Sequence, residues 1–351
     1  MRRYMPAEFD RQSSIWLGWP SNESTFRTSK AQLVIEQVAR LISPHVKVHI
    51  VAPPSTWAQA YQRFQGAENI FVTEVECNDG WMRDVAPTFL SDDSAVSWKF
   101  TGWGKPRTIV HEKDALVAVK ICNSIGFPCQ ILDFVLEGGS ISVDGKGTLM
   151  ATEETLLNKN RNPSLTKHQI ENVLKGTLGV SKVLWLPFGI SGDADTNGHI
   201  DNMAIFYAPG KVLLTWPIGC GTGSCADPDQ EMRSLAALQV LENATDARGR
   251  KIKVVKIPHP PIMFYTKQEA ESIIQTKASF PRKEGTRIAA TYINMIFCND
   301  IIVIPTFNCY TDEIALKVMK ELFPSKKVVG VFSRELNLGG GNIHCMSQQQ
   351  P

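Results

Sequence analysis

The sequence predicts an α/β fold in which five related αβ units form a five-bladed αβ propeller, and three observations lead to this prediction. Amphipathic helical segments alternate five times with short β-branched runs. Four strand–turn–strand hairpins lie between these units. The last unit lacks a complete hairpin, and the N-terminal run 14–19 can supply its missing strand. That pairing would close a ring between the two ends of the chain and remove an open sheet edge.

Apolar residues at intervals of three and four mark the helices, and helix-start residues precede several of them. Thr166 and Thr311 fit N-caps, and Asp227 fits an N-cap followed by Pro228 at the first helical position. In chain order, the expected helices are 29–43, 110–125, 166–178, 228–245 and 311–323. The strands that follow them are 46–51, 127–132, 180–186, 251–257 and 327–332. An additional helix and strand are expected within about 55–76.

Turn-forming residues separate the paired strands of each expected hairpin. The hairpins join 88–90 to 95–98, 140–143 to 148–150, 203–206 to 212–215 and 293–297 to 301–304. A doubly wound open parallel sheet is the competing architecture, because it also alternates helices and strands. Such a sheet would rarely place a hairpin after every strand, so the hairpins favour the propeller.

The composition gives no indication of a nucleic-acid or membrane partner. Lys and Arg total 37 and Asp and Glu total 35, so the net charge is only +2. No charge-free apolar run reaches the roughly 18 residues that a transmembrane helix needs. The first residues lack the apolar region of a secretory signal, so we expect a cytoplasmic protein. We treat residues 1–351 as a single catalytic domain.

The eight cysteines are too few for a disulfide scaffold in a chain of this length. Cys220 and Cys225 have four residues between them, near the spacing of metal ligands. No second pair of ligands follows at a matching interval, since the next histidine is His259. The sequence therefore predicts no metal site.

Residues suited to catalysis fall at one place in the repeat, the polar stretch between a strand and its hairpin. These stretches are 78–84, 136–139, 192–201 and 338–345, in units one, two, three and five. A five-fold arrangement would bring them together near the ring axis. Carboxylates, one histidine and one cysteine would then meet in a single cleft.

Taken separately, each of these residues also has a structural explanation. Asp84 follows Arg83 and fits an ion-paired loop carboxylate, and Glu137 precedes two glycines that fit a tight turn. His199 and Asp201, at positions i and i+2, would share one face of a strand. A buried histidine with satisfied hydrogen bonds would explain His199 equally well.

Cys345 follows three glycines and is either a poised nucleophile or a small buried hydrophobe. His344 would point to the other face of a strand, so we assign it a structural role. The combination of residues is more informative than its parts. A thiol nucleophile needs a general acid–base, and a histidine in that role needs an orienting carboxylate. Two further carboxylates, Asp84 and Asp201, suit a guanidinium with its five N–H donors.

Long, ordered motifs extend over essentially the whole chain, at 5–8, 16–20, 81–84, 136–141, 158–163, 192–202, 339–345 and 348–351. On these motifs the chain resembles the agmatine deiminase family, part of the guanidino-group-modifying superfamily with the pentein five-bladed fold. Departures from the family pattern occur at 25–27, at Ser142 and from Cys220 to Cys225. None of them touches a catalytic position.

The resemblance implies a hydrolase that converts agmatine to N-carbamoylputrescine and ammonia, a step in polyamine and putrescine biosynthesis. It implies that Cys345 attacks the guanidinium carbon, while His199 protonates the departing ammonia and later activates water. Glu137 matches the carboxylate that orients this histidine. Asp84 and Asp201 match the pair that holds the guanidinium N–H groups. The implied reaction requires no metal or organic cofactor.

For the distal ammonium of agmatine, the sequence offers Asp193 and Asp195, and we expected no basic residue beside this acidic pair. We favour Asp195 because it lies closer to His199, and we expect Trp81 to pack on the substrate. A peptidyl-arginine deiminase of the bacterial type is the alternative, although its known members are exported. A non-catalytic binding pentein would have lost the nucleophile or the histidine. The sequence leaves a homo-oligomer open.

Overall fold

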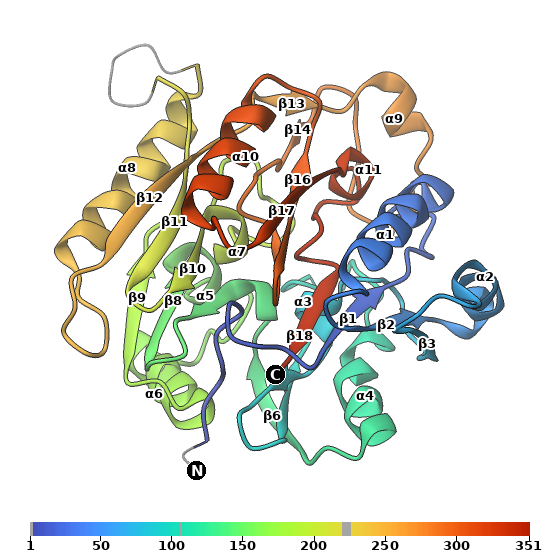
Figure 1. Cartoon of the computed structure of the whole chain (residues 1–351), viewed down its shortest axis with the longest axis horizontal. Coiled ribbons are helices and arrows are strands. Elements are labelled where there is room, and N and C mark those ends of the chain that lie inside the picture. The colour runs from blue at the N-terminus through green and yellow to red at the C-terminus, as the bar shows by residue number, and fades with distance from the viewer. Residues whose placement is uncertain (1–2, 106, 220–225) are drawn as a thin grey trace.

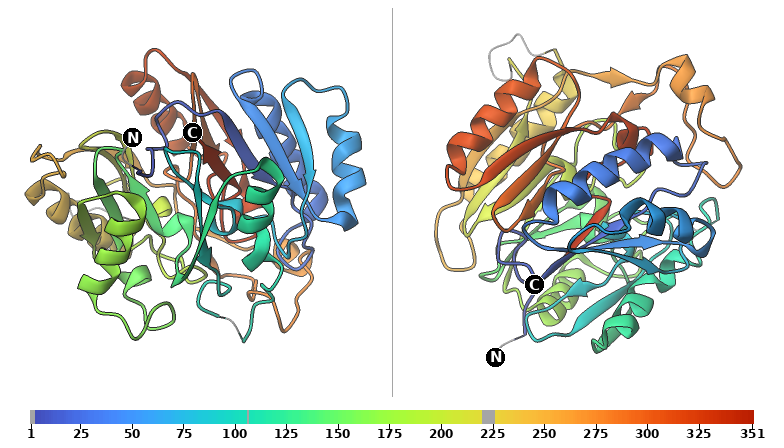
Figure 2. Two further views of the ribbon diagram at one scale, coloured as in Figure 1. Left: turned by 90° about the horizontal axis from the view of Figure 1, so that it is seen from below. Right: turned by 45° about the vertical axis from the view of Figure 1, so that its right-hand side comes forward.

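The computed structural model describes residues 3–105, 107–219 and 226–351, so Cys220 and Cys225 lie outside the described residues. The chain has a mixed α/β architecture in which the longer helices lie toward the outside and the strands lie inside them (Figures 1 and 2). Among the described residues, no helix is both long and apolar enough to span a bilayer.

Four sheets repeat one arrangement, an antiparallel hairpin followed by a third strand parallel to the second. Their strands are β4 (Thr88–Phe89), β5 (Ala95–Lys99) and β6 (Cys129–Val135); β7 (Ile141–Val143), β8 (Thr148–Thr152) and β9 (Lys182–Leu186); β10 (Ala204–Ala208), β11 (Lys211–Trp216) and β12 (Lys253–Pro258); and β15 (Ile296–Cys298), β16 (Ile301–Thr306) and β17 (Lys327–Phe332). The four predicted hairpins and the strands after them are confirmed.

A fifth sheet joins the two ends of the chain, where β18 lies beside β1 in Figure 1. Its strands are β18 (Ser347–Gln350), β1 (Ser14–Gly18), β2 (Lys47–Ala52) and β3 (Ile70–Glu74). Strand β1 is antiparallel to β18 and parallel to β2, so this sheet repeats the pattern of the other four. The predicted pairing between the ends is confirmed. A sixth, unpredicted sheet pairs β13 (Met263–Phe264) with β14 (Arg287–Ile288).

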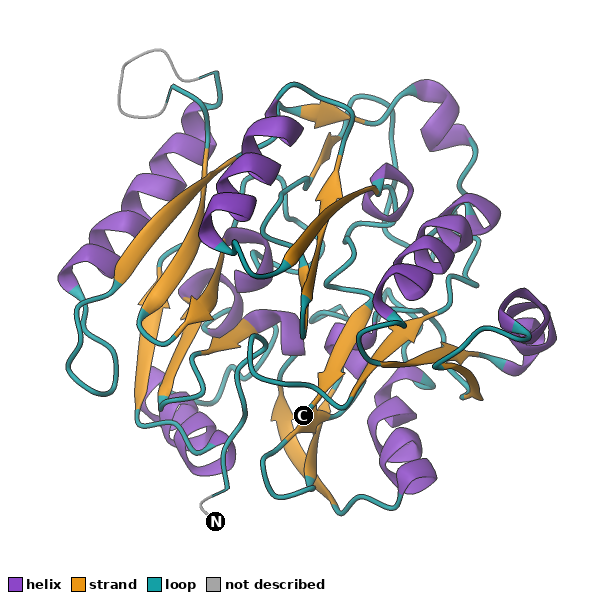
Figure 3. Cartoon of the chain, viewed as in Figure 1, coloured by secondary structure: helices purple, strands orange, loops and turns teal. Residues whose placement is uncertain are grey.

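The five predicted helices are present, as the colouring of Figure 3 makes clear. They are α1 (Thr28–Ile42), α4 (Val117–Ile125, after the 3₁₀ turn η1, Asp114–Leu116), α6 (Lys167–Leu178), α8 (Pro228–Asn243) and α10 (Thr311–Leu322). The additional unit is α2 (Pro54–Phe64) with β3. Thr166 and Asp227 cap their helices as predicted. Thr311 does not, because Tyr310 precedes α10 and the Asp312 carboxylate accepts the loop amides of Phe307 and Cys309 instead.

Short helices, rather than extended segments, hold the polar stretches. They are α3 (Met82–Val85), the 3₁₀ turn η2 (Gly138–Ser140) and α7 (Ile200–Met203); the remaining short helices are α5 (Glu153–Leu156), α9 (Lys267–Glu271) and α11 (Arg334–Asn337). Both α3 and α7 pack against η2. The largest apolar cluster runs from β1, β2 and α1 to Trp81, Ile343 and Cys345, so the core supports the polar stretches from beneath.

Candidate active site

Gly139 lies at the point where the predicted catalytic residues meet. A Cβ atom placed on Gly139 would lie 2.6 Å from His199 Nδ1, and 2.9 Å from both Asp201 Oδ2 and Asp84 Oδ1. The Gly139 amide donates to Asp84 Oδ1 at 3.0 Å. Only glycine leaves room for three functional side chains to close over the backbone in this way. The structure therefore brings the polar stretches of units one, two and three together.

The Cys345 thiol lies beside these carboxylates and is almost completely buried. Its Sγ atom lies 3.6 Å from Asp201 Oδ2 and accepts a hydrogen bond from Asn294 Nδ2 at 3.1 Å. Burial, followed by the charges of Asp201 and Asp84, raises the pKa of Cys345 well above its ordinary value. Cys345 is therefore a neutral thiol in the free protein at neutral pH. Sequence reasoning missed Asn294, whose signal is an amide inside an otherwise apolar run.

His199 is the residue before α7, so the predicted strand carrying His199 and Asp201 on one face is wrong. Its Nδ1 atom lies 3.8 Å from Asp84 Oδ1, and its Nε2 atom lies 3.7 Å from Glu137 Oε2. Burial alone would lower the pKa of His199. The carboxylates of Asp84 and Glu137 outweigh burial and raise that pKa to about 9. The ring is therefore a cation at neutral pH and can donate a proton.

Glu137 is fully buried and pairs with Arg161, whose Nε atom lies 2.9 Å from Glu137 Oε1. Burial would raise the pKa of Glu137, but the guanidinium of Arg161 outweighs it and lowers that pKa to about 2. Arg161 also donates to the carbonyl of Thr196 in the loop before His199. Arg161 thus connects Glu137 to the loop that precedes His199. Arg161 lies in the motif at 158–163, but the sequence predicts no pairing between Arg161 and Glu137.

Asp84 and Asp201 differ in how their oxygens are used. Asp84 accepts from Trp103 Nε1 at 2.8 Å as well as from Gly139. Burial raises the pKa of Asp84, while the nearby His199 partly opposes that rise. Asp201 Oδ2 faces Cys345 and His344, and Asp201 Oδ1 is buried without a hydrogen-bond partner among the residues that the structure describes. A buried acceptor without a partner is costly unless a ligand supplies a donor.

His344 does not point away from the site, and the prediction that it faces the other side of a strand is wrong. The segment around Cys345 is a turn, and β18 begins only at Ser347. The His344 ring turns back toward α7, with Nδ1 3.0 Å from Asp201 Oδ2. Its Nε2 atom lies 2.7 Å from Glu8 Oε2.

The two acidic residues expected at the distal end occupy different positions. Asp193 is turned into its own loop, where it accepts from the amide of His199 at 3.1 Å and from the Thr196 hydroxyl at 2.5 Å. Asp195 is partly exposed and forms an ion pair with Arg282, whose Nη2 atom lies 2.7 Å from Asp195 Oδ2. Lys105 Nζ donates to the Asp195 carbonyl. The expectation of no basic residue here is therefore wrong.

A narrow cavity above Cys345, which we call the slot, has a volume of about 20 Å³, room for about one water molecule. It is lined by Trp81, Asp84, Trp103, Asp195, Thr196, Asn202, Phe280, Gly339, Gly340, Gly341 and Cys345. His199, Asp201 and Glu137 lie behind this wall, against Asp84 and Cys345.

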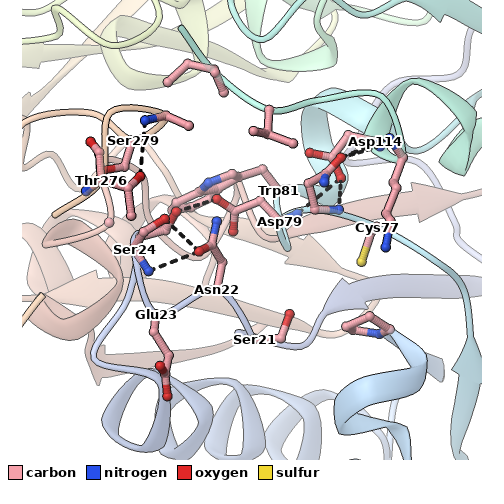
Figure 4. A pocket seen from close by; sticks show the side chains of 18 of the residues that line it. Ser21, Asn22, Glu23, Ser24, Cys77, Asp79, Trp81, Asp114, Thr276 and Ser279 are labelled. Carbon is pink, nitrogen blue, oxygen red and sulfur yellow. Dashed lines mark hydrogen bonds between the residues drawn. The ribbon is translucent and has the colours of Figure 1, made fainter. Parts of the chain in front are cut away.

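A larger cavity of about 610 Å³, which we call the vestibule, adjoins the slot. The two share Trp81, Trp103, Phe280 and Gly339, and Figure 4 shows Trp81 on the vestibule wall beside Asp79. The vestibule is polar, with Asp114 among its lining residues. This arrangement gives an elongated cation a path from solvent to Cys345.

Comparisons with known proteins found relatives over essentially the full length of this chain. Residues 4–351 match the family described as Porphyromonas-type peptidyl-arginine deiminase. An agmatine deiminase of Medicago truncatula is 43% identical, over 99% of this chain and 96% of its own length. A solved structure of the agmatine deiminase of Enterococcus faecalis matches with a TM-score of 0.92 at 35% identity, covering 99% of this chain and 96% of that chain. A putative arginine deiminase structure from Porphyromonas gingivalis has a TM-score of 0.85 at 26% identity, covering 100% and 98%.

Proposed function

Because this chain belongs to the agmatine deiminase family, we propose that it hydrolyses the guanidinium group of agmatine to give N-carbamoylputrescine and ammonia. The observation that carries this proposal is the grouping of Asp84, His199 and Asp201 over Gly139, with the Cys345 thiol beside Asp201. Two carboxylates, one imidazolium and one thiol are the groups that deimination of a planar cation needs.

We interpret the five equivalent sheets as the blades of a five-bladed αβ propeller of the pentein type. The shared strand pattern and the pairing of β1 with β18 support this interpretation, in which the terminal sheet closes the ring. We further propose that residues 1–351 form a single catalytic domain and that the protein is cytoplasmic. Six cysteines in the described part of the chain are free thiols, which suits a reducing compartment.

Binding of the guanidinium would change the state of the thiol. Asp201 Oδ1 has no hydrogen-bond partner in the described part of the chain, so it can accept a guanidinium N–H group, and Asp84 lies close enough to accept another. The bound cation compensates the two negative charges that raise the pKa of Cys345. The thiol proton then passes to solvent water, and the thiolate forms beside the carbon that it attacks.

The proposed reaction has two half-reactions. The sulfur of Cys345 forms a bond to the guanidinium carbon, and His199 gives its proton to the departing nitrogen as the C–N bond breaks and ammonia leaves. A covalent amidino adduct remains on the sulfur. Neutral His199 then takes a proton from water, and the hydroxide attacks the same carbon. The C–S bond breaks as the hydroxyl proton passes to the sulfur, which releases the ureido product and restores the thiol. Glu137 holds the ring between these steps.

The pH dependence of kcat/KM should report on His199. The proton-donating form is present below a pKa of about 9, so activity on agmatine should fall as the pH rises through about 9. Glu137→Gln removes one carboxylate that raises this pKa, so the alkaline decline should begin at lower pH and the maximal rate should fall. Steady-state kinetics from pH 6 to 10 test this. An unchanged alkaline limb in Glu137→Gln would exclude the orienting role of Glu137.

Asp195 is our candidate for the residue that binds the distal ammonium of agmatine. We compare agmatine with pentylguanidine, which has a methyl group in place of the ammonium. Asp195→Asn should lower kcat/KM for agmatine by at least about tenfold, as expected for a lost charge-assisted hydrogen bond, and should spare pentylguanidine. Asp193→Asn is the matched control and should lower both substrates alike, because Asp193 holds the His199 loop. An unchanged agmatine preference in Asp195→Asn would remove only the claim about Asp195.

The alternative substrate, peptidyl arginine, is less compatible with the narrow slot and its aromatic walls. A panel of agmatine, free arginine and a blocked arginine peptide, with ammonia measured, tests the proposal directly. We expect rapid release from agmatine and none from the peptide. Free arginine should be poor, because its carboxylate would have to compete with Asp195 for Arg282. Comparable efficiency on arginine would overturn the agmatine assignment.

A further inference from the structure

A chain of buried charged groups extends from the nucleophile to the N-terminal segment. Its successive contacts are Cys345 Sγ to Asp201 Oδ2 (3.6 Å), Asp201 Oδ2 to His344 Nδ1 (3.0 Å), His344 Nε2 to Glu8 Oε2 (2.7 Å) and Glu8 Oε2 to Arg83 Nη2 (3.6 Å). All five side chains are more than nine-tenths buried. The reaction steps above assign no role to His344, Glu8 or Arg83, although each comes from a distinct sequence motif.

We propose that His344 is a positioning residue that acts as an imidazolium between Asp201 and Glu8, fixing Asp201 so that its Oδ1 atom stays available for the guanidinium. This inference rests on the proposed function for the identity of the substrate. It gives a functional role to His344, which the sequence predicts to be structural. It also explains why the N-terminal segment reaches the catalytic turn.

The geometry favours a protonated ring. Both ring nitrogens lie at hydrogen-bond distance from carboxylate oxygens, and an ionised carboxylate can only accept. Each nitrogen must then carry a hydrogen, which makes the ring an imidazolium. The groups facing it are Glu8, Asp201 and Arg83, so two buried negative charges meet two buried positive charges. Such a balanced network is tolerated in the interior, whereas removal of one member leaves an unpaired charge.

Asp201 depends on this contact for its orientation. The His344 ring engages Oδ2 from behind, and among the described residues the thiol of Cys345 is the one other donor to this carboxylate. Without the ring, the carboxylate could rotate and present a different oxygen to the slot. The negative charge beside the thiol would also lose its compensating cation. The thiol would then ionise less readily, because an uncompensated carboxylate disfavours the thiolate.

Arg83 supports the same arrangement from α3. Its amide donates to the Cys345 carbonyl at 3.1 Å, and its guanidinium pairs with Glu8 and donates to Gln349 Oε1 at 2.7 Å. The motif residue beside Asp84 therefore fixes the backbone of the nucleophile, while its charge holds Glu8. The motifs at 5–8, 81–84 and 339–345 thus converge behind Asp201.

The test compares His344→Asn with His344→Gln. The asparagine amide can occupy the place of Nδ1 and still donate to Asp201, whereas the glutamine amide reaches toward Glu8. We expect kcat/KM for agmatine to fall by about tenfold in His344→Asn and by about a hundredfold in His344→Gln, with KM rising in both. His259→Gln is the control, a buried histidine that contacts Thr215 away from the site. Equal losses in the two His344 variants would mean that the residue is merely structural.

A second readout does not depend on agmatine turnover. We measure alkylation of Cys345 by iodoacetamide against pH, using peptide mass spectrometry without substrate. In His344→Gln the rate at pH 9 should fall by at least about threefold, because the thiol loses a nearby positive charge. Glu8→Gln should give a smaller decrease in the same direction and serves if His344→Gln fails to fold. Unchanged alkylation profiles in folded variants would overturn the proposal, whereas wild-type inactivity on agmatine would overturn only the proposed function.

Discussion

Replacement of Cys345 by serine should lower ammonia release from agmatine by at least about a thousandfold, while the fold is retained. Serine keeps the shape of the side chain, but its hydroxyl ionises far less readily than a thiol and is a much weaker nucleophile. The site makes this difference larger, because burial, Asp201 and Asp84 oppose any negative charge on the nucleophile. Steady-state ammonia assays and thermal melts of both proteins check the two halves of this expectation.

Trapping the covalent intermediate identifies the nucleophile directly. Acid quenching of the wild type during turnover should give an intact mass increased by one amidino group that still carries the aminobutyl chain of agmatine. Peptide mapping should place this group on Cys345. Cys77→Ser is the matched control, because Cys77 lines the adjoining vestibule but contacts none of the catalytic groups described above. It should keep near-wild-type turnover. An adduct on Cys77, or on any cysteine except Cys345, would overturn the assignment.

The regular elements of the fold were predictable because their signals are local. Helical spacing, β-branched runs and turn residues found the five helices and the four hairpins, and Thr166 and Asp227 act as caps. No comparable signal marks the two-residue strands β13 and β14, which are too short to show a period. Thr311 was mistaken for a cap because the carboxylate one residue later accepts the loop amides instead.

The site was predictable to the extent that the repeat itself determines it. Placing the polar stretches at one position in each unit brought Asp84, Glu137, His199 and Cys345 to one region. Their partners could not be found in the same way. Glu8 and His344 are separated by 336 positions and touch only after the chain ends pair. Arg282 reaches Asp195 from a segment without regular structure, so no periodic pattern points to it.

Replacement of His199 by glutamine should lower kcat by at least about a thousandfold, because in the proposed mechanism His199 transfers protons in both half-reactions. Glutamine has a polar side chain of similar length, but it can neither donate a proton to the nitrogen that leaves as ammonia nor take a proton from water. KM should change little, since we propose that Asp84 and Asp201 hold the guanidinium. A rate within about tenfold of wild type would show that another group transfers the protons.

His199→Gln should also change how the stability of the fold depends on pH. This measurement reports the charge on His199 independently of its part in proton transfer. The folded-state pKa of about 9 lies above the ordinary value of 6.5, so the imidazolium stabilises the fold fully below pH 6.5. That contribution is lost as the pH rises through about 9, where the folded ring also loses its proton. The Tm of the wild type should therefore fall between pH 6.5 and 9 more steeply than that of His199→Gln. Parallel Tm curves would mean that Asp84 and Glu137 do not hold a charged histidine.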